Sequence, residues 1–197
     1  MAGSAAKAAG RPFVFIDAGA NVGLFSFLVA SRAGANAKIV AIEPDQQSLN
    51  RLRFNAAANP RLDIQIMPNA LGETRGKVTL EIDPRDRGGT HTKPAADTSG
   101  AGAVECRTLL DTLTEAGVTS IDALKIDTEG AEDQILVPFF RDADRSLWPK
   151  LILIEGPQPG WRYDVLGILA KAGYTIAGRT RLNLILRHSE LARIAQK

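Results

Sequence analysis

The chain has 197 residues, of which 45% are hydrophobic and 23% charged, a balance typical of a folded globular chain of one domain. Its 24 Lys and Arg nearly cancel its 22 Asp and Glu, which argues against a surface dedicated to nucleic acid or another polyanion. The single cysteine, Cys106, excludes an internal disulfide framework and a zinc site built from several thiolates, and it favours a reducing compartment such as the cytoplasm.

The apolar runs and the first residues of the chain indicate whether it carries a membrane span or a signal peptide. No apolar run approaches the roughly 20 residues that span a bilayer, so we expect no membrane partner. Residues 1–10 are small and Ala-rich and lack the apolar core of a signal peptide, and we expect a flexible segment over residues 1–12. A single domain is expected over residues 13–190. The sequence leaves open whether it forms a homo-oligomer or belongs to a larger multidomain chain.

Short apolar runs alternate with amphipathic stretches along the chain, as strands alternate with helices. We expect strands over residues 13–17, 38–43, 63–67, 77–82, 104–107, 122–127, 150–155, 174–177 and 182–187. We expect helices over residues 22–31, from 45 onward, from 108 onward, from about 130 onward and over 161–172. This alternation predicts an α/β, doubly wound fold with a mostly parallel sheet covered on both faces. The last two strands are close enough in sequence to form an antiparallel hairpin at one end.

Two of these elements carry expectations about packing. In the helix over residues 22–31, an apolar stripe at helical spacing is expected to face the core, and it consists of Leu24, Phe25, Leu28 and Val29. The strand over residues 150–155 is the most continuously apolar of the chain, so we expect it to be central in the sheet.

The stretch from Asp83 to Gly102 differs in kind, because it holds four Gly, two Pro and three Thr and shows no apolar periodicity. We therefore expect a long loop at residues 83–103. A loop of that length inside a compact domain is usually functional or disordered, and this one could act as a lid over a site.

In a doubly wound fold, ligands bind beyond the carboxyl ends of the strands, so the residues that follow each strand are the candidate site residues. After the first strand, Gly19 allows a sharp turn and Gly23 allows the next helix to pack closely. Asn21 stands where the nicotinamide-dinucleotide fingerprint G-x-G-x-x-G has its second glycine. Asp17 precedes the turn, where a carboxylate repels a pyrophosphate and suits a ligand with an ammonium group. A plain strand-to-helix connection remains the alternative.

The next two strands also end in polar residues. Glu43 ends the second strand, 26 positions after Asp17, and can accept hydrogen bonds from both hydroxyls of a ribose. The third strand leads to Asn69, which could bond an adenine edge, and to Ala70, which leaves room for the ring. Asn and Gly are common turn residues, so this last signal is weak by itself.

The most polar cluster follows the strand over residues 122–127 and comprises Lys125, Asp127, Glu129 and Glu132. Strand alternation puts Lys125 and Asp127 on one face. Several ionisable groups at one strand end are costly unless they are paired or used, so a site is expected here. The alternative is a salt-bridge network at the start of a helix.

Taken together, these residues resemble the FkbM-type family of S-adenosylmethionine-dependent methyltransferases. The resemblance extends over residues 13–187 and rests on FIDAGANVGLFSF (15–27), IEP (42–44), NALG (69–72) and DALKIDTEGAEDQIL (122–136). It implies a seven-stranded, Rossmann-like methyltransferase sheet. It also implies S-adenosylmethionine as methyl donor, S-adenosylhomocysteine as product, and a small-molecule partner with a hydroxyl acceptor on a sugar, polyketide or related metabolite.

The resemblance also implies roles for single residues. The methionyl end of the cofactor would be held by Asp17, Gly19, Asn21 and Gly23. Glu43 would hold the ribose, and Asn69 and Ala70 would lie beside the adenine. The reacting methyl and the acceptor would be faced by Lys125, Asp127, Glu129 and Glu132.

A hydroxyl that attacks a methyl group must lose its proton, which requires a base within hydrogen-bond reach. The candidates are Asp127, Glu129, Glu155 and His91, of which His91 titrates near neutrality. Alternatively, Mg²⁺ held by Asp127, Glu129 and Glu155 could lower the pKa of the acceptor. The sequence does not decide between a base and a metal. We expect His188 to be structural or exposed, and Cys106 to be a small packed residue.

Three other functions are compatible with parts of the pattern. A nicotinamide-dependent oxidoreductase would share Glu43 and the first glycine turn, but Asn21 replaces the glycine that it needs. A non-catalytic adenosyl-binding module would be expected to lose Asp17 or Glu43, and both are present. A nucleic-acid methyltransferase would show a basic surface with aromatic residues, whereas aromatic residues are 6% of this chain.

Overall fold

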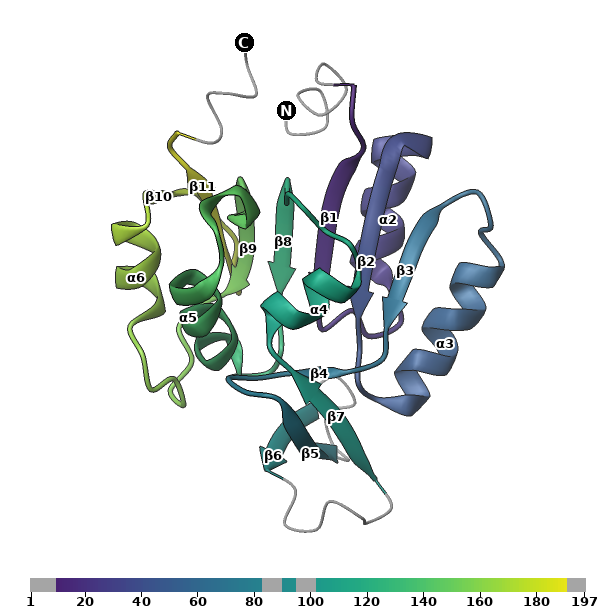
Figure 1. Cartoon of the computed structure of the whole chain (residues 1–197), viewed down its shortest axis with the longest axis horizontal. Coiled ribbons are helices and arrows are strands. Elements are labelled where there is room, and N and C mark those ends of the chain that lie inside the picture. Colours follow the sequence, from purple (N-terminus) through teal and green to yellow (C-terminus); the bar gives the residue numbers. More distant parts are fainter. Residues whose placement is uncertain (1–9, 83–89, 95–101, 191–197) are drawn as a thin grey trace.

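The computed structural model describes residues 10–82, 90–94 and 102–190, and a seven-stranded sheet forms its centre (Figure 1). The strand order is β10-β11-β9-β8-β1-β2-β3. These strands are β1 (Phe13–Ala18), β2 (Ala37–Ile42), β3 (Asp63–Met67), β8 (Ala123–Ile126), β9 (Leu151–Glu155), β10 (Tyr174–Arg179) and β11 (Asn183–His188). From β9 to β3 all neighbours are parallel, whereas β11 is antiparallel to both β9 and β10. The predicted sheet with its antiparallel C-terminal hairpin is confirmed.

Helices cover both faces of this sheet. One face packs against α4 (Leu109–Glu115), α5 (Glu132–Asp142) and α6 (Val165–Lys171), and the other against α2 (Leu24–Ala33) and α3 (Gln46–Ala57). Short 3₁₀ turns, η1 (Gly34–Asn36) and η2 (Arg145–Leu147), complete the connections. The two-residue period of β1 explains the layering, because Val14 and Ile16 join the core under α4 and α5 while Phe13 and Phe15 pack against α2.

Two details of the sheet and its cover differ from expectation. The strand β9 is interior, but β8 occupies the middle position of the order. In α2, Phe25 and Val29 of the predicted stripe pack against the core, but Leu24 is 72% exposed and Leu28 is 48% exposed. The fully buried positions are instead Ser26 and Ala30. Small residues let α2 lie close to the sheet, and this close approach turns the two leucines outward.

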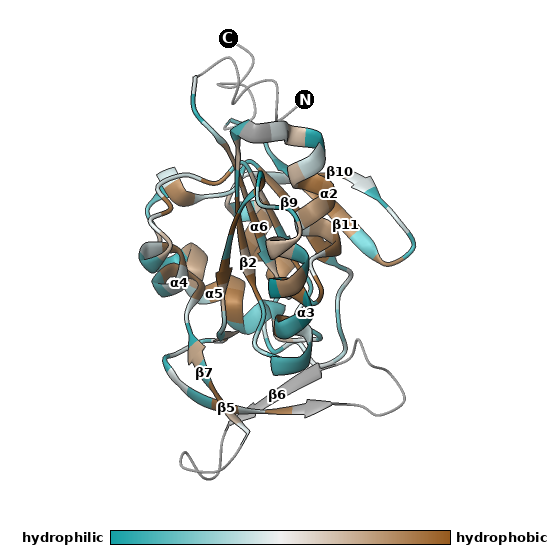
Figure 2. Ribbon diagram, turned by 90° about the vertical axis from the view of Figure 1, so that its right-hand side faces the viewer, coloured by the Kyte–Doolittle hydropathy of each residue, from teal (hydrophilic) through white to brown (hydrophobic). Residues whose placement is uncertain are grey.

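A second, four-stranded sheet lies beyond the carboxyl edge of the main sheet, at the foot of the molecule in Figures 1 and 2. It consists of β4 (Ala70–Leu71), β5 (Gly76–Ile82), β6 (Thr90–Pro94) and β7 (Ala103–Arg107), in the order β4-β7-β5-β6. The prediction of a long loop at residues 83–103 is therefore wrong at residues 90–94, which form β6, and at Ala103, where β7 begins. The strand β6 is held by antiparallel pairing with β5, and backbone pairing needs no apolar periodicity in the sequence. Residues 83–89 and 95–101 lie outside the described part.

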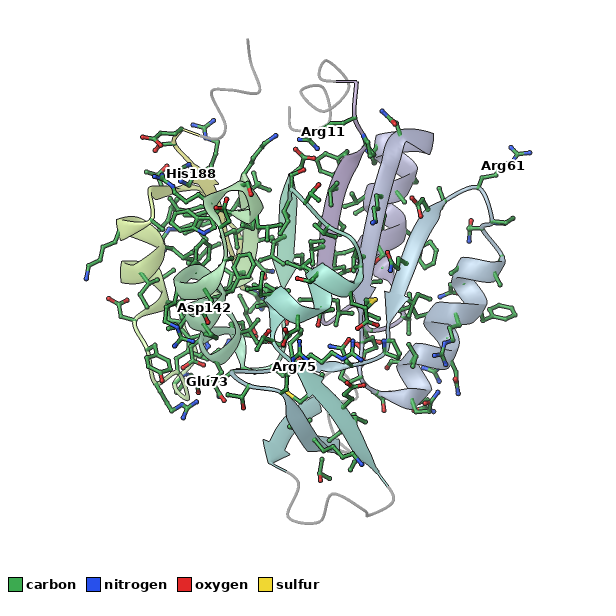
Figure 3. The ribbon with its side chains drawn as sticks, viewed as in Figure 1. Arg11, Arg61, Glu73, Arg75, Asp142 and His188 are labelled. Carbon is green, nitrogen blue, oxygen red and sulfur yellow. The ribbon has the colours of Figure 1, made fainter. Side chains whose placement is uncertain are left out.

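The start of the described chain is held by a buried carboxylate, Asp122, which is 0% exposed. Arg11 donates to both of its oxygens at 2.7 and 2.6 Å, and Lys150 Nζ donates to Oδ1 at 2.9 Å. The backbone N–H of Val14 donates to Oδ2 at 3.0 Å. Part of the segment that was predicted to be flexible, residues 1–12, is thus fixed at Arg11, while residues 1–9 lie outside the described part. Figure 3 shows Arg11 at the end of the molecule opposite the small sheet.

In the described part of the chain, no helix combines the length and the apolar character that crossing a bilayer requires.

We predict that Asp122→Asn lowers the free energy of unfolding by about 3 kcal/mol at neutral pH, the scale of a broken buried ion pair. Burial opposes ionisation of Asp122, but the hydrogen bonds from Arg11 and Lys150 outweigh it and lower its pKa. Because the folded-state pKa is lowered, the ionised carboxylate stabilises the fold above its unfolded pKa of about 3.9, and this stabilisation is lost as the pH falls through the folded value.

Urea denaturation at several pH values measures this difference. Asp142→Asn is the control, since Asp142 pairs with its exposed neighbour Arg141, and it is expected to leave stability unchanged. A wild-type and Asp122→Asn pair with equal stability at pH 7 would contradict the prediction.

Candidate functional site

A pocket of about 370 Å³ opens at the carboxyl edge of the main sheet, over the ends of β1, β2 and β8 and beside β4. Its wall comes from four chain segments that follow strands: Gly19, Ala20, Asn21, Val22, Leu24 and Phe25; Ile42, Glu43, Pro44 and Ser48; Asn69, Ala70 and Leu71; Lys125, Asp127, Thr128, Glu129 and Ala131. Most of the residues expected at the site are thus brought together. The size falls in the range of small-molecule sites.

The turn after β1 passes very close to the end of β8. A Cβ at Gly19 would lie 1.9 Å from the backbone oxygen of Asp127, and the φ of Gly19 is +75°. Only glycine fits there, because any side chain would drive the two strand ends apart. Gly23 has a φ of +92°, and a Cβ there would meet Leu52 at 2.6 Å, so it permits the contact between α2 and α3. Gly23 therefore shapes the turn without lining the pocket.

Asp17 forms a buried ion pair with Lys125, which lines the pocket. Asp17 is 0% exposed, and its Oδ2 accepts a hydrogen bond from Ser26 at 2.6 Å. Lys125 Nζ lies 3.5 Å from Asp17 Oδ1 and donates to the carbonyl oxygen of Gly19 at 2.6 Å. Burial raises the pKa of Asp17, although the charge of Lys125 opposes the rise. Asp17 does not line the pocket, so the expected direct contact between its carboxylate and a ligand stays a prediction.

Glu43 presents a carboxylate that is held by two backbone donors. Its Oε2 accepts from Asn21 N at 2.7 Å and its Oε1 from Asp45 N at 2.8 Å. The side chain is 7% exposed, and burial raises its pKa. Asn21 has a φ of +50°, which turns its N–H toward Glu43. A carboxylate has about four acceptor positions, so two remain for a ligand in the pocket.

At the wall formed by β4, Asn69 and Ala70 are 2% and 1% exposed. Asn69 Nδ2 donates to the carbonyl oxygen of Ala70 at 2.9 Å and to Thr112 Oγ1 at 3.1 Å. The amide group thus fastens β4 to α4, and the expected contact of Asn69 with an adenine edge stays a prediction.

Three carboxylates lie at the ends of β8 and β9: Asp127 and Glu129 follow β8, and Glu155 is the last residue of β9. The Asp127 side chain is 39% exposed, and its Oδ2 lies 3.7 Å from Lys125 Nζ. Glu129 lines the pocket with a backbone φ of +56°, a conformation that costs a non-glycine residue on the order of 1 kcal/mol. Burial and the negative charges of Asp127 and Glu132 raise the pKa of Glu155. At this edge of the sheet, a carboxylate beside a small-molecule pocket can accept a proton.

Glu132 does not face the pocket, which corrects the expectation from the sequence. It is 0% exposed, and its carboxylate accepts hydrogen bonds from Thr128, Gly130 and Trp161. The reason is that Glu132 is the first residue of α5, where a carboxylate collects the N–H groups of the preceding turn.

The other candidate residues are His91, His188 and Cys106. His91 belongs to β6 and not to a loop, with its backbone opposite Glu81, and its side chain lies outside the described part. His188 is 1% exposed and packs edge-on against Tyr174, as expected of a structural residue. Cys106 is buried, and burial raises the pKa of its thiol, which suits a packed residue. Sequence reasoning missed Ser26, although a serine inside an apolar stripe is a visible signal.

The donors proposed for Mg²⁺ do not form a metal site. Within residues 10–82, 90–94 and 102–190, no three His, Cys, Asp or Glu side chains gather in a group that could hold a metal ion.

Comparisons with known proteins agree on one chemistry. The family model of the methyltransferase FkbM domain matches residues 17–176. Methyltransferase sdnD of Sordaria araneosa is 30% identical over 199 residues, which cover 84% of this chain and 74% of that protein.

Solved structures show the same fold at lower identity. Methyltransferase FkbM from Methylobacillus flagellatus KT has a TM-score of 0.58 at 19% identity, over 89% of this chain and 43% of that one. The METTL16 MTase domain has a TM-score of 0.55 at 15% identity, over 94% of this chain and 63% of that one. The chain thus spans less than half of the Methylobacillus structure.

The close approach at Gly19 generates a prediction about stability. We expect Gly19→Ala to lower the free energy of unfolding by about 3 kcal/mol or more, because a left-handed conformation and a steric overlap with Asp127 add together. The matched control is Gly117→Ala, since Gly117 has a φ of +63° but nothing within 4 Å of its Cβ position. That control should lose about 1 kcal/mol. Denaturant unfolding of both variants measures the difference, and equal losses would show that the contact with Asp127 is not tight.

Proposed function

The chain belongs to the FkbM methyltransferase family, and from this membership we propose that it uses S-adenosylmethionine to methylate a hydroxyl oxygen of a small molecule. The acceptor class we propose is a sugar, a polyketide or a related metabolite, with S-adenosylhomocysteine as the product. We assign the activity to one domain, residues 13–190. The observation that carries the proposal is the doubly held carboxylate of Glu43 at the pocket wall.

Glu43 fits the ribose of an adenosyl cofactor. Its two oxygens each hold one backbone N–H and each keep an acceptor position, which matches the two neighbouring hydroxyls of a ribose. Ala70 and Leu71 line the wall, and their apolar side chains suit contact with an adenine ring. Asn69 lines the same wall and is held in place by its hydrogen bond to Thr112.

The turn from Gly19 to Asn21 fits the methionyl end. Its backbone lines the pocket, and the buried carboxylate of Asp17 below it favours a ligand that carries an ammonium group. Gly23 lets the turn close onto α2. S-adenosylmethionine would supply an electrophilic methyl group at this end of the pocket, near Lys125 and Asp127.

We propose Asp127 as the group that accepts the proton of the acceptor hydroxyl. It lines the pocket, its side chain is part-exposed, and Lys125 Nζ lies 3.7 Å from its Oδ2, which fixes where the carboxylate stands. Lys125 itself orients Asp127 and the Gly19 turn, and Glu129 lines the same wall. Leu24 and Phe25 also line the pocket, which suits an acceptor with an apolar portion.

Two other residues are alternative bases, and two other functions differ in the ligand bound or in turnover. Glu155, with its raised pKa, and His91 are the alternative bases. Magnesium is not part of the proposal, because the described carboxylates do not gather into a metal-binding group. A nicotinamide-dependent oxidoreductase would bind NAD, and a non-catalytic module would bind the cofactor without turnover.

Partners and location are also proposals. We expect a small-molecule acceptor and neither nucleic acid nor membrane as partner, with a homo-oligomer or a larger parent chain open to test. The single cysteine supports a cytoplasmic location.

We predict that Glu43→Ala weakens S-adenosylhomocysteine binding by about 1.5–3 kcal/mol, the scale of a lost hydrogen bond to a charged group. Calorimetric titration of the full chain measures it, with Glu115→Ala on α4 as a control that should bind like the wild type. NAD should not bind measurably. Tight NAD binding without S-adenosylhomocysteine binding would contradict the proposal.

We predict that Asp127→Asn keeps most of the affinity for S-adenosylhomocysteine and slows methyl transfer about 100-fold or more, as expected for a lost base or positioning group. The acceptor is first identified by measuring S-adenosylhomocysteine release across a panel of hydroxylated sugars and polyketides. His91→Ala should have a smaller effect. Full turnover by Asp127→Asn on the true acceptor would instead assign these carboxylates to a charge network at a helix start.

A further inference from the structure

Glu132 lies behind the pocket wall and gathers donors from two separate segments. Its Oε1 accepts from Thr128 N at 2.7 Å, from Thr128 Oγ1 at 3.1 Å and from Gly130 N at 3.3 Å. Its Oε2 accepts from Trp161 Nε1 at 3.0 Å. The side chain is 0% exposed and does not line the pocket. It therefore reaches the site through residues 127–131, the segment that we call the pocket wall and that supplies Asp127, Thr128, Glu129 and Ala131 to the lining.

The donors around Glu132 require a carboxylate. The backbone N–H groups of Thr128 and Gly130 can only donate, and so can the indole N–H of Trp161. Glutamine has the same shape, but it must point its NH₂ group at one of these donors. A buried donor that faces another donor loses its hydrogen bond. The isosteric change Glu132→Gln is thus expected to break one side of the arrangement.

The pocket wall needs such support. Glu129 and Gly130 have φ values of +56° and +95°, two consecutive residues in the left-handed region. A strained turn of this kind persists only where surrounding contacts fix it. Glu132 supplies those contacts, because its Oε1 holds the N–H groups on both sides of Glu129.

The other side of Glu132 leads to residues 157–163, which we call the Trp161 segment. This segment follows β9 and is held twice at the start of α5, since Asp133 Oδ2 also accepts from Arg162 N at 2.6 Å. Asp133 is likewise 0% exposed. Arg162 Nη2 reaches Glu73 Oε2 at 3.2 Å, which ties the segment to the turn between β4 and β5. Figure 3 shows Glu73 and Arg75 near the junction of the two sheets.

We propose that Glu132 is a positioning residue that couples the pocket wall to the Trp161 segment, so that a ligand in the pocket and this segment order each other. The proposal rests on the proposed function for its ligand. A ligand in the pocket restrains Thr128 and Glu129. Because Glu132 is hydrogen-bonded both to these residues and to Trp161, the Trp161 segment becomes ordered as well. Arg162 extends this ordering to the small sheet. The side of the site that receives the acceptor is then completed when the cofactor binds.

Hydrogen exchange of the full chain with S-adenosylhomocysteine tests the coupling. We expect slower exchange in peptides that cover residues 127–131 and also in peptides that cover the Trp161 segment, which contributes no residue to the pocket lining. Protection confined to the pocket-lining segments would overturn the proposal.

Three variants test the need for a carboxylate. Glu132→Gln should weaken S-adenosylhomocysteine binding about tenfold, the scale of a lost hydrogen bond to a charged group, and Trp161→Phe alone should weaken it less than about threefold. In the double variant the donor that clashes with glutamine is gone, so affinity should return to within about threefold of the wild type. Glu115→Gln is the control glutamate and should bind like the wild type. A double variant weaker than Glu132→Gln would overturn the coupling.

Ligand binding tests the proposed function, whereas hydrogen exchange without ligand tests the coupling. If calorimetry finds no S-adenosylhomocysteine binding to the wild type, the proposed function fails. The coupling is then measured without ligand, where Glu132→Gln should speed exchange in both the pocket wall and the Trp161 segment. Faster exchange in the pocket wall alone, or in neither, would overturn it.

Discussion

The buried ammonium of Lys125 is the interaction on which the carboxyl edge of the sheet depends. It is 5% exposed, and it lies within 3.5 to 3.7 Å of the carboxylates of Asp17 and Asp127 while it donates to Gly19 O at 2.6 Å. One cation thus joins the ends of β1 and β8, two neighbouring strands that are far apart in sequence. Without it, Asp17 would be a buried and uncompensated charge, and the turn at Gly19 would lose its partner on β8.

The two halves of the site are built in different ways. The half assigned to the cofactor relies on short backbone contacts at strand ends, with Glu43 bound to Asn21 and Asp45. The half assigned to the acceptor is assembled from distant segments that meet at the start of α5, where Glu132 and Asp133 hold Trp161 and Arg162. The first half of the site is therefore formed by the backbone at the strand ends. The second half depends on a few side-chain hydrogen bonds between distant segments.

The sequence predicted the strand ends well and the side-chain partners less well. Residues such as Glu43 could be assigned because parallel strands end at one edge, so a polar residue after a strand has a known place. The exposure of Leu24 could not be predicted, since the burial of α2 depends on how closely Ser26 and Ala30 let this helix approach the sheet. Glu132 was expected at the methyl group, but the donors that turn it away include Trp161, which no local pattern links to it. The strand β6 is fixed by pairing with β5, a contact that hydrophobic periodicity does not encode.

A crystal structure with S-adenosylhomocysteine bound tests the central claim most directly, namely that the carboxyl edge of this sheet is an adenosyl site. The account predicts both ribose hydroxyls within hydrogen-bond distance of the Glu43 carboxylate. It also predicts the adenine against Ala70 and the sulfur atom on the side of the pocket that Asp127 lines. A ribose bound away from Glu43, or a ligand bound outside the pocket described by Gly19, Glu43 and Asp127, would contradict it.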